Sequence, residues 1–206
     1  CRKKKIRYYI FIDEIQEIAD FKVTIRSLAI DDNNDIYITG SNSEMFSSDL
    51  ANELGGRYVE FRIYSLSYLE FLNFHKLSND DVSLEKYFHF GGLPYLIHLP
   101  LEEPVVMEYV RSVYSTIILR DVVERKKIRN TVFLEQLIRF LANNVGSLFS
   151  SNSISDFLKS QQVKISPNQV SEYADSLAEA FVVHRIGRYD IVGKKLFERG
   201  EKYFFE

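Results

Sequence analysis

The sequence predicts an α/β region followed by an all-helical region that ends in a β-hairpin. Three observations favour this order. Up to about residue 64, apolar strand-like runs alternate with a stretch of helical periodicity. From residue 65, helix-capping motifs and apolar stripes at helical spacing predominate. Finally, residues 182–189 and 195–205 form two strand-like runs around a glycine turn. The expected domains are therefore residues 1–64, 65–128 and 129–206.

The α/β region begins with an apolar, β-prone run over residues 8–12, which is typical of a strand buried on both faces of a parallel sheet. Helical spacing follows over residues 21–29, and a second apolar strand covers residues 36–38. A strand, a helix and a strand with short connections predict a right-handed crossover between parallel strands. Alternating polarity over residues 59–63 predicts a third strand.

The helical region has clear start and stop residues. The capping box from Ser67 to Glu70 opens a helix that continues to about residue 74. A second helix is expected over residues 82–90, before a glycine pair, and a third begins near Pro104.

The last part of the chain has the pattern of a winged helix. One helix is expected over residues 132–144, Ser153 is expected to cap a short second helix, and Ser166 opens a third with a capping box. Three helices followed by a hairpin are typical of the winged helix-turn-helix.

Composition excludes several classes of function. The net charge is −3, so the chain as a whole lacks the basic character of a polyanion-binding protein. Cys1 is the only cysteine, which excludes an internal disulfide and suits the reducing cytoplasm, the expected location. No apolar run reaches the roughly 18 residues of a membrane span, so no membrane partner is expected.

The candidate catalytic residues follow the strands. Asp13 and Glu14 come directly after the first strand, at the edge where open α/β sheets bind ligands. In a phosphate-transfer site, the first carboxylate holds Mg²⁺ and the second polarises the attacking water. Ser41 and Asn42 follow the second strand and could orient that water, and Arg57, after a glycine pair, could stabilise phosphate charge. Each also has an ordinary interpretation, as a strand end, a helix cap or a surface arginine.

Several motifs, in this order, resemble a prokaryotic branch of the AAA+ ATPases. They are FIDEIQ, TGSNS, LGGRY and SLSYLEF, followed by GGLPYLI, ILRDVVER and NNVGSLFS. The resemblance implies a partial parallel-sheet P-loop-type ATPase domain followed by helices and a winged helix. It also implies a Walker B pair at Asp13 and Glu14, sensor 1 at Ser41 or Asn42, and an arginine finger at Arg57. ATP and Mg²⁺ would be the cofactors of the parent protein.

The chain departs from this pattern because it contains no G-x-x-x-x-G-K-[S/T] phosphate loop. The chain is therefore expected to be a fragment of a AAA+ ATPase, inactive alone and without bound cofactor. Its expected partners are the N- and C-terminal segments of its own parent, including a nuclease-like domain, and a second copy bound through the strand region.

The alternative is a binding module for DNA or protein with no ATPase role. The helix after Ser166 carries acids that repel phosphate, whereas the hairpin offers Arg188, Lys194 and Lys195. Docking to protein, or a purely structural role, is therefore favoured over DNA binding. Any DNA binding is expected to be weak and to involve these three residues.

Overall fold

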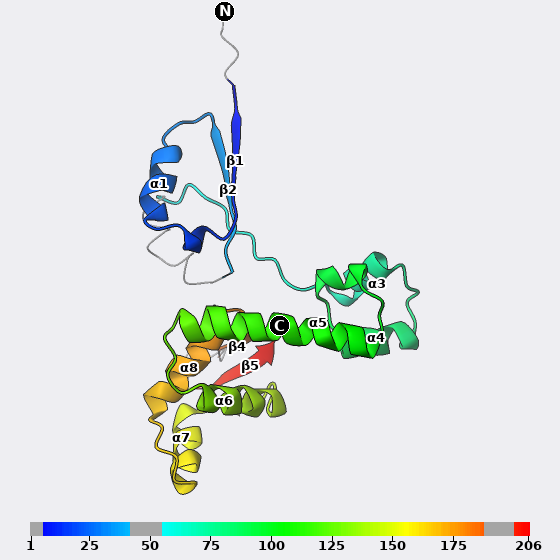
Figure 1. Cartoon of the computed structure of the whole chain (residues 1–206), viewed down its shortest axis with the longest axis vertical. Helices are drawn as coiled ribbons and strands as arrows, with labels where there is room; N and C mark the ends of the chain where they lie inside the picture. Colours follow the sequence, from blue (N-terminus) through cyan, green and yellow to red (C-terminus); the bar gives the residue numbers. More distant parts are fainter. Residues whose placement is uncertain (1–5, 42–54, 188–199) are drawn as a thin grey trace, which may run out of the picture.

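The computed structural model describes residues 6–41, 55–187 and 200–206 (Figure 1). The predicted site residues Asn42, Arg188, Lys194 and Lys195 lie outside the described residues.

The N-terminal part contains the predicted crossover unit. Strand β1 (Tyr8–Ile12) pairs in parallel with β2 (Asn34–Ile38), and Ile10 lies opposite Ile36. The connection contains a short 3₁₀ helix, η1 (Ile15–Glu17), and helix α1 (Phe21–Leu28), which covers one face of the pair (Figure 1). Ile15 and Ile25, both almost fully buried, form the centre of this small core. The parallel pairing places the carboxyl ends of β1 and β2 side by side.

Two predictions about this region are wrong. Residues 57–64 do not form a third strand, and Val59, Phe61 and Ile63 along this segment are exposed. Strand β1 is not buried on both faces either, because Tyr8, Tyr9 and Phe11 are exposed. Both differences have one cause: within the described part of the chain the sheet has only two strands, so neither segment has the neighbours that would cover it.

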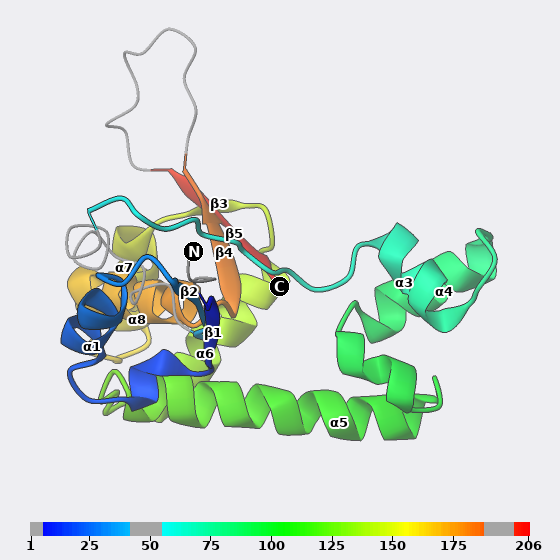
Figure 2. The same cartoon turned by 90° about the horizontal axis from the view of Figure 1, so that it is seen from above.

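A helical lobe follows, built from α3 (Tyr68–His75), α4 (Asp81–Phe90), the 3₁₀ helix η3 (Pro94–His98) and α5 (Glu103–Thr116). The predicted capping box is confirmed, because the Ser67 N–H donates to the Glu70 carboxylate at 2.9 Å. Helix α5 continues without a break into a π-helix, η4 (Ile117–Glu124), which the sequence did not predict. The resulting long helix runs from the α3–α4 lobe to the C-terminal part (Figure 2).

The C-terminal part consists of α6 (Thr131–Asn143), α7 (Ser151–Ser160) and α8 (Pro167–Glu179) packed on a three-stranded antiparallel sheet. The strand order is β3 (Leu148–Phe149), β5 (Glu201–Phe205), β4 (Val183–Ile186), and β3 was not predicted. The cap of α7 was also predicted wrongly: Ser150 accepts the hydrogen bond, and Ser153 donates it. The three helices and the two hairpin strands are confirmed, and the winged-helix assignment stays a prediction.

The main core lies in this C-terminal part. It joins apolar faces of α6 and α8 to the sheet and to η4, which contributes Ile118 and Val122. Because η4 packs tightly into this core, it is fixed in place relative to the C-terminal part. No described helix is long and apolar enough to cross a membrane.

Candidate functional site

Thr39 joins the two strand ends at the candidate site. The Thr39 hydroxyl donates a hydrogen bond to Asp13 Oδ1 and accepts one from the Glu14 N–H at 3.2 Å. Backbone bonds extend the pairing here, because Thr39 N donates to the Ile12 carbonyl at 2.9 Å. Sequence reasoning missed Thr39 as a site residue, although it is the first polar residue after β2 and begins the TGSNS cluster.

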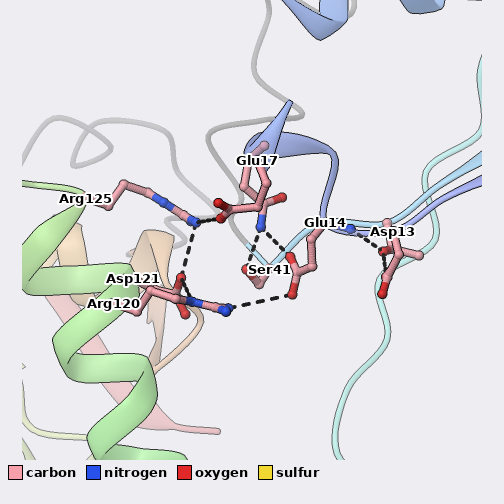
Figure 3. Close-up of polar contacts among 9 residues, drawn as sticks. Asp13, Glu14, Glu17, Ser41, Arg120, Asp121 and Arg125 are labelled. Carbon is pink, nitrogen blue, oxygen red and sulfur yellow. Dashed lines mark hydrogen bonds and ion pairs between the residues drawn. The ribbon is translucent and has the colours of Figure 1, made fainter. Parts of the chain in front are cut away.

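Glu14 has an unusual backbone conformation. Its φ of 47° and ψ of 53° lie in the left-handed region, which costs a residue with a side chain roughly 1–2 kcal/mol. Such conformations are concentrated at functional sites, where the surrounding structure holds them in place. The turn points the Glu14 side chain toward Arg120, whereas Asp13 points to the other side (Figure 3).

Gln16 brings Ser41 into the same site as Glu14. Its side-chain amide donates to Glu14 Oε2 and also to Ser41 Oγ, the latter at 3.1 Å. The structure therefore brings together Asp13, Glu14 and Ser41 of the predicted site residues. Among the residues that the structure describes, Arg57 makes no interaction with these three, and it lies exposed after the glycine turn.

Arg120 of η4 and Arg125, the residue that directly follows η4, complete the site (Figure 3). Arg120 Nη2 lies 3.7 Å from Glu14 Oε1, and Arg125 Nη2 lies 3.6 Å from Glu17 Oε1. Both guanidinium groups also contact Asp121 Oδ1, at 3.3 Å and 3.2 Å. The sequence signal for these residues was the ILRDVVER motif, in which charged residues interrupt an apolar stretch.

The two arginines of this cluster are shared among three carboxylates, Glu14, Glu17 and Asp121. Asp121 is only 3% exposed, and a buried carboxylate needs cationic partners of this kind. The hydrogen bond and the charge of Asp121 raise the pKa of Arg120, the carboxylates of Glu14 and Glu17 add to this, and partial burial opposes it. Arg120 therefore presents a permanent positive charge to the Glu14 carboxylate.

The donor set at the strand ends fits Mg²⁺ bound together with phosphates. Asp13 is exposed and offers a carboxylate oxygen at the carboxyl edge of the sheet. No group of three or more potential metal-ligating side chains occurs in residues 6–41, 55–187 and 200–206. Mg²⁺ in phosphoryl-transfer sites takes one or two carboxylates, and water and substrate phosphates supply its other oxygens.

Two family models match different parts of the chain. Residues 2–72 match the model of an AAA domain, so the parallel strands and the acidic pair belong to an AAA-like region related to the P-loop ATPases. Residues 81–205 match the model of a domain of unknown function, DUF8612. Because that match covers more than half of the sequence, the chain belongs to the DUF8612 family.

Two relatives cover most of the chain. An uncharacterized protein of Haemophilus influenzae is 36% identical over 202 residues, which is 96% of this chain and 50% of the relative. The uncharacterized protein MJ1544 of Methanocaldococcus jannaschii is 29% identical over 198 residues, which is 91% of this chain and 44% of the relative. The chain thus spans about half the length of the curated relatives it matches.

Proposed function

We propose that these residues form the acidic, water-activating half of an ATPase site, and that the full-length protein hydrolyses Mg-ATP and couples hydrolysis to movement of its helical region. The observation that carries the proposal is the pair Asp13–Glu14 at the carboxyl end of β1, beside the polar end of β2. The match of this region to an AAA domain supports the proposal independently.

Each residue of the site has a distinct role in this proposal. Asp13 holds Mg²⁺, directly or through water, and the ion neutralises charge on the transferring phosphate. Glu14 accepts a hydrogen bond from the attacking water and takes up its proton. Ser41 helps to orient that water, together with Asn42, and Arg57 acts on a phosphate as an arginine finger. Backbone amides and a lysine that grip the phosphates come from outside these 206 residues.

Glu14→Gln in the full-length protein tests the proposal. The glutamine amide cannot act as a base, so ATP should turn over at least about 10²-fold more slowly. Because Asp13 is still present to hold Mg²⁺, ATP should bind normally. Asp20→Asn is the matched control, since Asp20 lies in the same connection and also has a left-handed backbone, with φ 54°. Phosphate release and fluorescent-ATP titration provide the two measurements.

The two possible failures have different meanings. Unchanged turnover in Glu14→Gln would remove this residue from the mechanism. Absence of ATP binding and turnover in the full-length wild-type protein would instead favour the binding module. The 206-residue chain alone is expected to show no turnover, because no phosphate loop within it compensates the triphosphate charge.

A further inference from the structure

The ion pair between Arg120 and Glu14 links the two regions of the chain. Glu14 lies in the segment that matches an AAA domain, and Arg120 lies in the segment that matches DUF8612. The pair between Arg125 and Glu17 repeats this connection a few residues further along both segments. Two parallel ion pairs therefore hold η4 against the loop that follows β1.

The π-helical geometry of η4 allows both arginines to face this loop. The Arg125 N–H donates to the Arg120 carbonyl at 3.3 Å, the i to i+5 bond that defines a π-helix. In an α-helix with 3.6 residues per turn, residues five apart lie roughly 140° apart around the axis. At α-helical spacing the two arginines would therefore leave the helix in more divergent directions. π-helices are rare and occur frequently at functional sites.

Asp121 anchors the pair of arginines from the buried side. It is almost fully buried and contacts both guanidinium groups, which restricts their side-chain freedom.

Both oxygens of the Glu14 carboxylate are engaged in this arrangement. Arg120 contacts Oε1 and Gln16 donates to Oε2, so these two side chains determine where the carboxylate points. We propose that Arg120 is a positioning residue for Glu14, and that η4 thereby makes the orientation of the Glu14 carboxylate depend on the position of the C-terminal part, with which η4 shares a core. The proposal rests on the proposed function of Glu14 as the base.

The kinetics of the full-length protein test this role. Arg120→Ala should lower kcat on the order of 10-fold and leave KM for Mg-ATP within about twofold, because it disturbs orientation and not substrate binding. Arg120→Lys keeps the charge and should restore part of the loss. Arg111→Ala, which changes an exposed arginine of α5, should turn over as the wild type does.

The double variant Glu14→Gln, Arg120→Ala separates positioning from other roles. If Arg120 acts through Glu14, the double variant should be as slow as Glu14→Gln alone. Losses that multiply, or a raised KM with unchanged kcat, would instead mean that Arg120 acts directly on the nucleotide. Thermal unfolding of each variant measures folding, and Arg120→Lys keeps the test valid if Arg120→Ala unfolds.

Failure of this inference is distinguishable from failure of the proposed function. Slow turnover in Glu14→Gln together with wild-type turnover in Arg120→Ala would overturn positioning alone. Wild-type turnover in Glu14→Gln would overturn both.

Discussion

Arg120 Nη2 lies 3.7 Å from Glu14 Oε1, and this ion pair joins the strand-end site to the long helix formed by α5 and η4. The helix extends from the α3–α4 lobe to the C-terminal core (Figures 1 and 2). The acidic pair and the C-terminal core are therefore joined through one continuous helix. The long helix, the buried Asp121 and the two arginines form a continuous physical connection between the C-terminal core and the acidic pair.

Asp121 is expected to contribute to stability through its two arginine partners. Asp121→Asn removes the charge but keeps the shape, so the free energy of unfolding should fall by roughly 1–3 kcal/mol. Asp156→Asn is the control, because the Asp156 side chain is 73% exposed and its pair with Lys159 should contribute about 0–1 kcal/mol. Urea unfolding of both variants gives the comparison. Equal losses would show that burial of Asp121 has no energetic consequence.

Gly92 is expected to be intolerant of any side chain. An added Cβ would lie 2.3 Å from the Leu66 carbonyl oxygen, and the Leu66 N–H donates to the Gly92 carbonyl at 2.7 Å. Since both contacts are with backbone, Gly92→Ala should displace the start of the helical lobe and cost about 1–3 kcal/mol. Gly187→Ala, where no atom of the described residues lies within 4 Å of the added Cβ, should be close to neutral. Thermal unfolding measures both, and a stable Gly92→Ala protein would contradict the close approach.

Glu206 is expected to make stability depend on acid pH. Its carboxylate accepts hydrogen bonds from Ser65 N and Oγ at 2.7 Å and 2.6 Å and contacts the His184 ring. Burial raises the pKa of Glu206, but these hydrogen bonds outweigh it, and the pKa lies below its ordinary value of 4.5. A depressed folded-state pKa gives stability that is present above pH 4.5 and lost as the pH falls through the folded pKa.

The measurement compares Tm of the wild type and Glu206→Gln over this pH range. The wild type should be more stable above pH 4.5, and the difference should disappear under more acidic conditions. Glu135→Gln, at an exposed position of α6, controls for the loss of one negative charge. A difference that is constant with pH would assign the effect to packing and not to ionisation.

The exposed face of β1 is expected to cause self-association of the 206-residue chain. Phe11 is 75% exposed and stacks on Tyr37 at 5.0 Å, and β1 pairs only with β2 among the described strands. Apolar side chains beside unpaired strand edges favour pairing with a second copy. Phe11→Glu should reduce the mass measured by light scattering after size exclusion. Val132→Glu, at a 67% exposed position of α6, should not. A monomeric wild type would contradict the prediction.

Elements with local causes could be predicted from the sequence. The capping boxes at Ser67 and Ser166 join groups three residues apart, so these helix starts need no information from elsewhere in the chain. The placement of Asp13 and Glu14 at the end of a strand could also be predicted locally, because the apolar run that forms the strand directly precedes them. Their proximity to Ser41 followed from one rule, that parallel strands end at the same edge of a sheet.

The sequence by itself thus determined most of the helix starts, the crossover unit and the position of the acidic pair. Only the tertiary structure decided whether residues 57–64 form a strand, because a strand needs a neighbour for its backbone bonds and the described sheet supplies none. Likewise, the contact between Arg120 and Glu14 depends on where the long helix packs and on the π-helical turn that orients its arginines. No local pattern contains that information, since Glu14 and Arg120 lie far apart in the sequence and η4 is placed by the core that it shares with α6 and α8.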